Sequence, residues 1–406
     1  MLRSLFSGIT GLRQHQTLMD VVGNNIANVN TVGYKSSTAV FEDTLSQMMR
    51  SAGAPNNGLG GVNPAQVGLG AQLGAISTNF AQGSAQNTGR ATDLMIQGDG
   101  FFVLKNGGNE VYSRAGSFTF DTTGKLVNPE GMRVQGWTGA AGTVNTNAAP
   151  GDIVLPAGTL IPPKASSSVV VDGNIAPDAN ATTDVLTLGQ TVYDASGAAH
   201  PLTITLTGDG AGNYTVTVAD ANDPNAAFVD GGATLAFDPN TGALTGTPVQ
   251  DTVTLPDGTT QVVIDFSTMT RYGGPKSANV KSADGYPAGS LQGFQISGDG
   301  SVIGVFSNDQ KLLMAKVALA GFNNPMGLEK SGNSTYRSTT NSGNPQINAP
   351  GTGGVGRLLG ATVEMSNVDL AQEFTNLIIA QRGFQANSRV ITTSDQMLQD
   401  LVDIKR

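Results

Sequence analysis

The sequence predicts a multidomain α+β fold in which paired, coiled-coil-like terminal α-helices enclose mostly antiparallel β domains, one inserted in another. Two observations support this prediction. Apolar residues near the two ends recur at spacings of three and four or their multiples. The middle is rich in Gly, Thr and Asn and alternates in short strands between turn residues. Because no central apolar helix exists to cover the terminal stripes, we expect the ends to join other copies of the chain.

The first predicted helix runs from Leu2 to about Ala27. It contains Gly8, Gly11 and Gly23, and each glycine costs about 1 kcal/mol relative to alanine in a helix interior. We therefore expect this helix to be ordered mainly when its apolar stripe is buried. The stripe consists of Leu5, Ile9, Leu12, Met19, Val22 and Ile26.

The last predicted helix runs from Asn367 to Lys405. Ser366 and Asp369 mark its start in a Ser-x-x-Asp arrangement, in which the serine oxygen accepts the amide three residues on. The acid faces the positive end of the helix dipole. The apolar stripe of this helix consists of Leu370, Phe374, Leu377, Phe384, Ile391, Leu398 and Val402.

The alternation of patterns along the chain divides it into regions. Residues 51–74 are rich in Gly, Pro and Asn without a hydrophobic period, which indicates an extended connector, with a disordered loop as the alternative. We expect its glycines Gly58, Gly60, Gly61 and Gly68 to give it hinge-like freedom. The predicted domains are 1–35 with 363–406 (terminal helices), 36–90 (connector), 91–165 with 270–362 (split β domain) and 166–269 (inserted outer β domain).

Composition excludes several classes of function. The net charge of −9 argues against a nucleic-acid partner, and no window of about 18 to 20 apolar residues predicts membrane insertion. The chain has no Cys and only two His, His15 and His200, so we expect no metal, no cofactor and no catalytic triad. The apolar start is interrupted by polar residues from Arg13 onward, so we expect no cleaved signal peptide.

Two terminal motifs carry a family resemblance. They resemble the axial proteins of the bacterial flagellar rod and hook, as does Asn87–Arg90 followed by Asp99–Phe102. The N-terminal motif comprises Asn24, Asn25, Ile26, Ala27 and Asn28, followed by Gly33, Tyr34 and Lys35. The C-terminal motif comprises Ser366, Asn367 and Asp369, followed by Gln381 and Arg382.

The resemblance implies a structural, non-enzymatic subunit. Within the family, the 166–269 insertion favours the hook proteins, whereas the stretch 51–74 resembles distal rod sequence. A hook subunit is expected to self-assemble as a homopolymer into a flexible curved tube that transmits motor torque from rod to filament. The implied partners are the rod, the hook cap, the hook–filament junction proteins and the flagellar type III export apparatus. The implied location is the extracellular flagellum, reached without a cleaved signal peptide.

Two alternatives remain open at this point. One is another member of the same axial family, a distal rod or hook–filament junction protein. The other is a β-rich secreted enzyme or adhesin, for which the sequence shows no clustered catalytic carboxylates and no nucleophile motif.

Overall fold

The computed structural model describes residues 2–55, 60–139, 142–155, 158–176, 184–209, 212–221, 231–238, 240–245 and 249–404. The chain divides into two compact units. The first contains Met1–Pro156, Phe294–Ile303 and Leu313–Arg406, and the second contains Ala157–Gly293 and Gly304–Leu312. Strands β22 (Gly289–Ile296), β23 (Ser301–Phe306) and β24 (Lys311–Val317) each contribute residues to both units.

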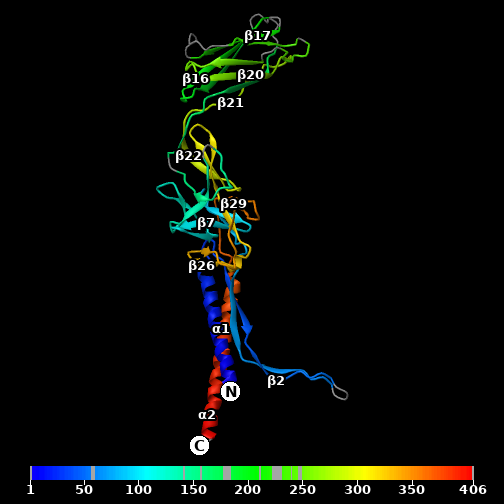
Figure 1. Ribbon diagram of the computed structural model, residues 1–406, viewed down its shortest axis with the longest axis vertical. Helices are drawn as coiled ribbons and strands as arrows, with labels where there is room; N and C mark the ends of the chain where they lie inside the picture. The colour runs from blue at the N-terminus through cyan, green and yellow to red at the C-terminus, as the bar shows by residue number, and fades with distance from the viewer. Residues whose placement is uncertain are drawn as a thin grey trace. The chain divides into compact units, whose positions relative to one another are not determined.

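The two ends of the chain form long helices that pack against each other. Helix α1 (Leu2–Ala27, blue) and helix α2 (Leu370–Ile404, orange to red) lie side by side in Figure 1. The bounds of α1 agree with the sequence prediction. The fold is thus a β-rich multidomain protein whose N-terminal and C-terminal helices are paired.

Helix α2 begins three residues later than predicted, because its N-cap is Asp369 and not Ser366. The Oδ1 atom of Asp369 accepts the amides of Ala371 at 2.9 Å and Gln372 at 3.3 Å. The Ser366 hydroxyl instead accepts the amide of Val368 at 3.4 Å, ahead of the helix. The predicted capping role of Ser366 is therefore wrong, and the acid supplies the cap itself.

A β ribbon follows α1, where the sequence predicted an extended connector over 36–90. Strand β1 (Ser37–Asp43) pairs antiparallel with β4 (Ala71–Thr78), and β2 (Ser46–Arg50) pairs antiparallel with β3 (Ala65–Gly68). Every residue of β2 and β3 is exposed, so these strands bury no face and leave no hydrophobic period to detect. Backbone pairing alone defines them.

The β domain of the first unit surrounds strand β7 (Phe101–Asn106). In the part that the structure describes, β7 pairs with β8 (Asn109–Ser113), β11 (Arg133–Thr138) and β25 (Leu319–Gly321). Its alternate side chains enter two apolar cores, one around Phe102 and Leu104 and one around Phe101 and Val103. The other strands and the short helix of this unit are β5 (Ala85–Asn87), β6 (Leu94–Gln97), β9 (Thr119–Phe120), β10 (Leu126–Val127), β12 (Gly151–Asp152), η2 (Pro325–Gly327), β26 (Glu329–Gly332), β27 (Thr335–Arg337), β28 (Gln346–Asn348), β29 (Arg357–Gly360) and β30 (Thr362–Glu364).

The second unit is a two-layer β structure with one apolar core. Its described strands form one sheet in the order β19-β20-β14-β21 and another in the order β15-β16-β17-β18. Both sheets contribute side chains to the same core, for example Val169 from one and Ile204 from the other. The strands are β13 (Leu160–Ile161), β14 (Ser168–Asn174), β15 (Val185–Tyr193), β16 (Ala199–Gly208), β17 (Asn213–Asp220), β18 (Thr234–Ala236), β19 (Gln250–Thr254), β20 (Gln261–Thr270) and β21 (Asn279–Ala283).

The second unit is larger than the predicted 166–269 domain. Strand β21 adds to the edge of β14, and β13 pairs with β22 through Leu160 and Ser290. These pairings bring residues on both sides of 166–269 into the unit. They join positions far apart in sequence, which a local pattern does not reveal.

Candidate assembly surface and helix junction

Small residues form the contact between α1 and α2. A Cβ atom added at Gly8 would lie 3.2 Å from Cγ1 of Ile391, one at Gly11 would lie 2.7 Å from Nδ2 of Asn387, and one at Gly383 would lie 2.3 Å from the ring of His15. Real Cβ atoms essentially never lie as close as at Gly11 and Gly383, and the approach at Gly8 is tight, so a larger residue would force Asn387, His15 or Ile391 to move. The glycines that weaken α1 in isolation thus permit its close packing on α2.

Only part of the predicted apolar stripes is covered in the single chain. Val22 is buried, and seven other stripe residues are half-buried: Leu5, Leu12, Met19, Ile26, Leu377, Ile391 and Leu398. Ile9, Leu370, Phe374, Phe384 and Val402 remain exposed, Phe374 to 50%. Large apolar side chains that the stripe analysis missed are also exposed on the two helices, namely Phe6, Ile378, Ile379, Val390, Met397 and Ile404. The helix pair therefore carries a large uncovered apolar surface.

The junction between the helices and the β domain is built around buried Asn25. Its Nδ2 atom donates to the carbonyl of Ser37 at 2.8 Å and to the carboxylate of Glu373 at 3.0 Å. Its Oδ1 atom accepts the Ser37 amide at 3.0 Å and the Tyr34 hydroxyl at 3.1 Å. One asparagine of the N-terminal motif thus joins α1, the chain that follows it and the first turn of α2.

Asn367 of the C-terminal motif also joins separate segments of the chain through its side-chain amide. Its Oδ1 atom accepts the Ser36 amide at 2.8 Å, and its Nδ2 atom donates to the carbonyls of Asn79 at 2.8 Å and Ala81 at 3.1 Å. These bonds align the segment that leads into α2 with the chain that leaves α1. The two motifs therefore meet in space although they lie at opposite ends of the sequence.

The turn after α1 depends on Asn24, Asn28 and Gly33. Asn28 donates to the carbonyl of Asn24 at 2.9 Å, and Asn24 donates to the Tyr34 hydroxyl at 3.3 Å. Gly33 has φ of 68°, and its amide donates to the carbonyl of Glu364 at 2.7 Å. An added Cβ would lie 2.4 Å from a backbone atom of Ala115, so only glycine fits. The predicted positive φ at Gly33 is confirmed.

Beneath this turn lies a buried group of three charges. The ammonium of Lys35 lies 2.6 Å from one oxygen of Glu364, and a guanidinium nitrogen of Arg114 lies 3.6 Å from the other. Their side chains are at most 2% exposed. Burial lowers the pKa of Lys35 and outweighs the opposing effect of Glu364. The amide of Gly83 donates to the Glu364 oxygen that faces Lys35, and Lys35 also donates to the carbonyl of Ala81.

Sequence reasoning placed Lys35 in a motif but missed Arg114 and Glu364. A single acid in the short strand Thr362–Glu364 was the available signal, and it identifies neither partner.

Gln381 and Arg382 of the C-terminal motif lie exposed on α2, away from the junction, and Ala27 is exposed at the end of α1. Ser366 is buried.

The connector glycines have different surroundings. Cβ atoms added at Gly60 and Gly68 would meet nothing within 4 Å, whereas one at Gly61 would lie 3.2 Å from Pro55. Gly58 lies outside the described residues. Close packing therefore does not explain the glycines at 60 and 68.

Across the described ranges, no group of three or more His, Asp or Glu residues is placed to hold a metal ion. No described helix has both the length and the apolar character needed to cross a membrane.

Comparison with known proteins gives the same family along the chain. Family models match residues 5–35 (flagella basal body rod protein), 95–177 (flagellar hook protein FlgE/F/G D1 domain), 165–286 (flagellar basal body protein FlaE D2 domain) and 360–404 (flagellar basal body rod FlgEFG protein C-terminal). The flagellar hook protein FlgE of Borreliella burgdorferi is 38% identical over the whole of both chains. That of Escherichia coli is 32% identical over 98% of each. A basal-body rod protein, FlgG of Bacillus subtilis, is 32% identical over the whole of both chains.

A solved structure is consistent with the fold. The crystal structure of Helicobacter pylori flagellar hook protein FlgE2 has a TM-score of 0.50 and 13% identity, and the match covers 67% of this chain and 98% of that one. The paired ends and the family matches define an axial structural protein of the bacterial flagellum. The chain belongs to the flagellar hook protein FlgE family. It is a structural, non-enzymatic hook subunit of the flagellum, and the distal rod and junction alternatives are not favoured.

Proposed function

We propose that the chain polymerises through the apolar faces of α1 and α2 that their own contact leaves exposed. The observation that carries this proposal is the exposure of Phe374 and Phe384 on helices already paired through small residues. Covering one such side chain contributes about 1.5–3 kcal/mol. In a tube, the helices of neighbouring copies cover these side chains and form a coiled-coil-like inner layer.

The β regions form the outer part of the subunit in this proposal. The domains predicted from the sequence, with 166–269 inserted in a split β domain, correspond to successive layers outside the helices. The matches to separate D1 and D2 family models at 95–177 and 165–286 support this division. The buried junction around Asn25 and Glu364 supports the base of each helix pair.

The proposed partners are those of a flagellar hook. They are the rod below, the hook cap during growth, the hook–filament junction proteins above, and the type III apparatus that exports the subunit to the extracellular flagellum. Glycine-containing, weakly self-stable helices such as α1 support export in an unfolded form and ordering on assembly.

A charge placed on the exposed face tests the proposal. Phe384→Asp is expected to abolish tube formation in high salt, as seen by electron microscopy of the full chain, while the β-sheet circular dichroism stays unchanged. Gln385→Asp is the matched control, because Gln385 is the adjacent exposed polar residue on α2. Tubes from Phe384→Asp would contradict the proposal.

A further inference from the structure

The β2–β3 ribbon carries apolar side chains that the described chain does not cover. Leu45 is 84% exposed, Met48 57% and Met49 68%. The pairing register shifts between Met48 and Arg50, so Met49 is an extra residue opposite β3. Such a bulge bends a strand and redirects its side chains. The ribbon therefore presents two flexible thioether side chains to its surroundings.

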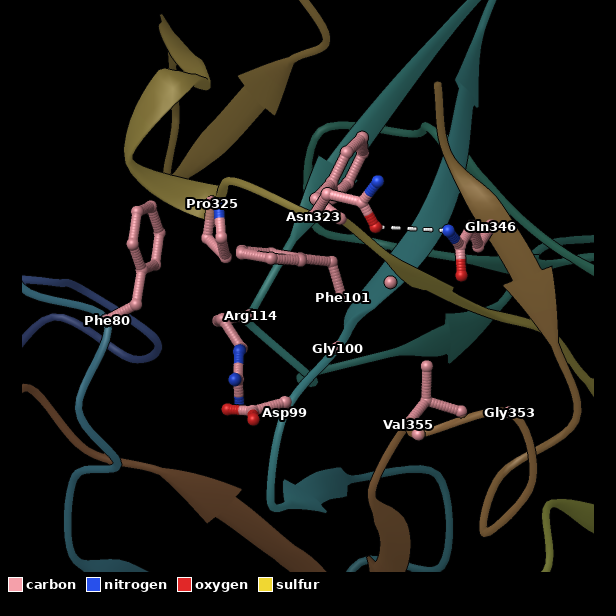
Figure 2. Close-up of a pocket in the computed structure, with 13 residues that line it drawn as sticks. Phe80, Asp99, Gly100, Phe101, Arg114, Asn323, Pro325, Gln346, Gly353 and Val355 are labelled. Atoms are coloured by element: carbon pink, nitrogen blue, oxygen red, sulfur yellow. Dashed lines mark hydrogen bonds between the residues drawn. The ribbon is translucent and has the colours of Figure 1, made fainter. Parts of the chain in front are cut away.

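A cavity of about 320 Å³ in the β domain of the first unit has the complementary chemistry. Phe80, Phe101, Phe322 and Pro325 line it, and Figure 2 shows the Phe80 and Phe101 rings beside Pro325. Phe101 meets Phe80 and Phe322 edge-on, at centroid distances of 5.4 and 5.8 Å. Methionine sulfur makes favourable contacts with aromatic rings. The cavity thus suits a methionine side chain.

The charges around the cavity and the ribbon are also complementary. The guanidinium of Arg114 at the base of the cavity is buried and donates to the carbonyl of Gly98 at 2.9 Å. Asp99 is an exposed residue, and Figure 2 shows its carboxylate beside the Arg114 guanidinium. Arg50, next to Met49, is exposed and contacts the Asn63 carbonyl, and it forms no ion pair with any described residue. The ribbon presents Met48 and Met49 next to the cation Arg50, and the cavity presents aromatic rings next to the acid Asp99.

We infer that the β2–β3 ribbon of one copy docks in this cavity of a neighbouring copy. Met48 and Met49 contact the aromatic wall, and Arg50 faces Asp99. The inference rests on the proposed polymerisation and identifies a second contact in the same polymer. A protrusion on one face and a socket on another give a head-to-tail contact, the kind that generates open helical polymers and not closed dimers.

Because the sequence has no cysteine, introduced cysteines are the only thiols available in a disulfide cross-linking test. The full-length double variant Met49→Cys, Asn323→Cys is assembled under reducing conditions and then oxidised. Asn323 lines the cavity and is exposed. A ladder of covalent multimers on a non-reducing gel is expected. The control pair Met49→Cys, Asn109→Cys uses an exposed residue outside the cavity lining and should give no ladder.

The outcomes separate this inference from the proposed function. Tubes without a ladder, or equal ladders from both pairs, would overturn the docking while leaving polymerisation intact. If the unaltered chain forms no tubes, the proposed polymerisation itself is contradicted. As a second measurement, Met49→Ser should raise the critical concentration for assembly several-fold, whereas Met49→Leu should leave it within about twofold. Equal values for the two variants would overturn the docking.

Discussion

The ammonium nitrogen of Lys35 lies 2.6 Å from a carboxylate oxygen of Glu364, and both side chains are completely buried. The two residues are 329 positions apart in the sequence. Lys35 follows α1 and Glu364 precedes α2, so the ion pair joins the two ends of the chain where both enter the β domain. Arg114 of that domain is the third charge in the group. The helix pair therefore has an anchored base formed by residues from three segments.

Removing the buried cation should be strongly destabilising. Lys35→Met leaves Glu364 with the Gly83 amide and the longer contact to Arg114, and loss of one partner from a buried ion pair costs about 3–5 kcal/mol. Urea unfolding followed by fluorescence and circular dichroism measures the loss. Lys164→Met is the matched control, because Lys164 is 52% exposed in its pair with Asp284, and such pairs contribute about 0–1 kcal/mol. Equal effects of the two substitutions would contradict the anchoring role.

The helix contact should reject even one added methyl group. Gly383→Ala would place a Cβ 2.3 Å from the His15 ring and is expected to separate the helices locally and lower their melting temperature. Gly23→Ala meets nothing within 4 Å and should stabilise α1 by up to about 1 kcal/mol. Thermal melting at the helical circular-dichroism band distinguishes them. Stabilisation by both substitutions would refute the close-contact interface.

The second unit should lose stability in acid through Asp284. Burial alone would raise the pKa of this carboxyl, but hydrogen bonds from Ser167, Ser168 and Lys164 hold it well below its ordinary value of 3.8. Because the unfolded chain binds the proton first, the stabilisation is fully present above pH 3.8 and is lost as the pH falls through the lower folded value. Asp284→Asn should therefore be destabilising at pH 7, and its difference from the unaltered chain should shrink below pH 3.8. A difference independent of pH, in denaturant titrations at several pH values, would exclude this linkage.

The connector should stiffen when its open glycines are replaced. In Gly60→Ala, Gly68→Ala the added Cβ atoms meet nothing within 4 Å, and neither residue has a positive φ. The double variant is therefore expected to fold normally and to lose only backbone freedom. The persistence length of tubes, measured from electron micrographs, should increase if the connector is a hinge. Unchanged bending would show that the flexibility lies elsewhere.

The sequence revealed local features more fully than long-range ones. The bounds of α1 follow from its periodicity, and the positive φ at Gly33 follows from glycine after an asparagine-rich turn. The contact between Arg114 and Glu364 is invisible in either local segment, because each is a single charge among apolar or small neighbours. It exists only when the ends of the chain meet.

The ribbon and the helix contact show two other limits of sequence reasoning. Strands β2 and β3 are exposed on both faces, so pairing leaves no alternation to read. In α1, the large residues of the stripe suggested the helix seam, but the close approach of Gly8 and Gly11 to α2 was not predicted. Glycine counts against a helix in propensity and reveals a close approach only once the partner helix is known.

The most direct measurement of the central claim is a high-resolution electron cryomicroscopy map of the assembled tube. The account predicts that Phe374 and Phe384 of α2 and Ile9 of α1, exposed in the single chain, lie buried against helices of neighbouring copies. A map in which these side chains face water, with copies joined only through their β domains, would contradict it.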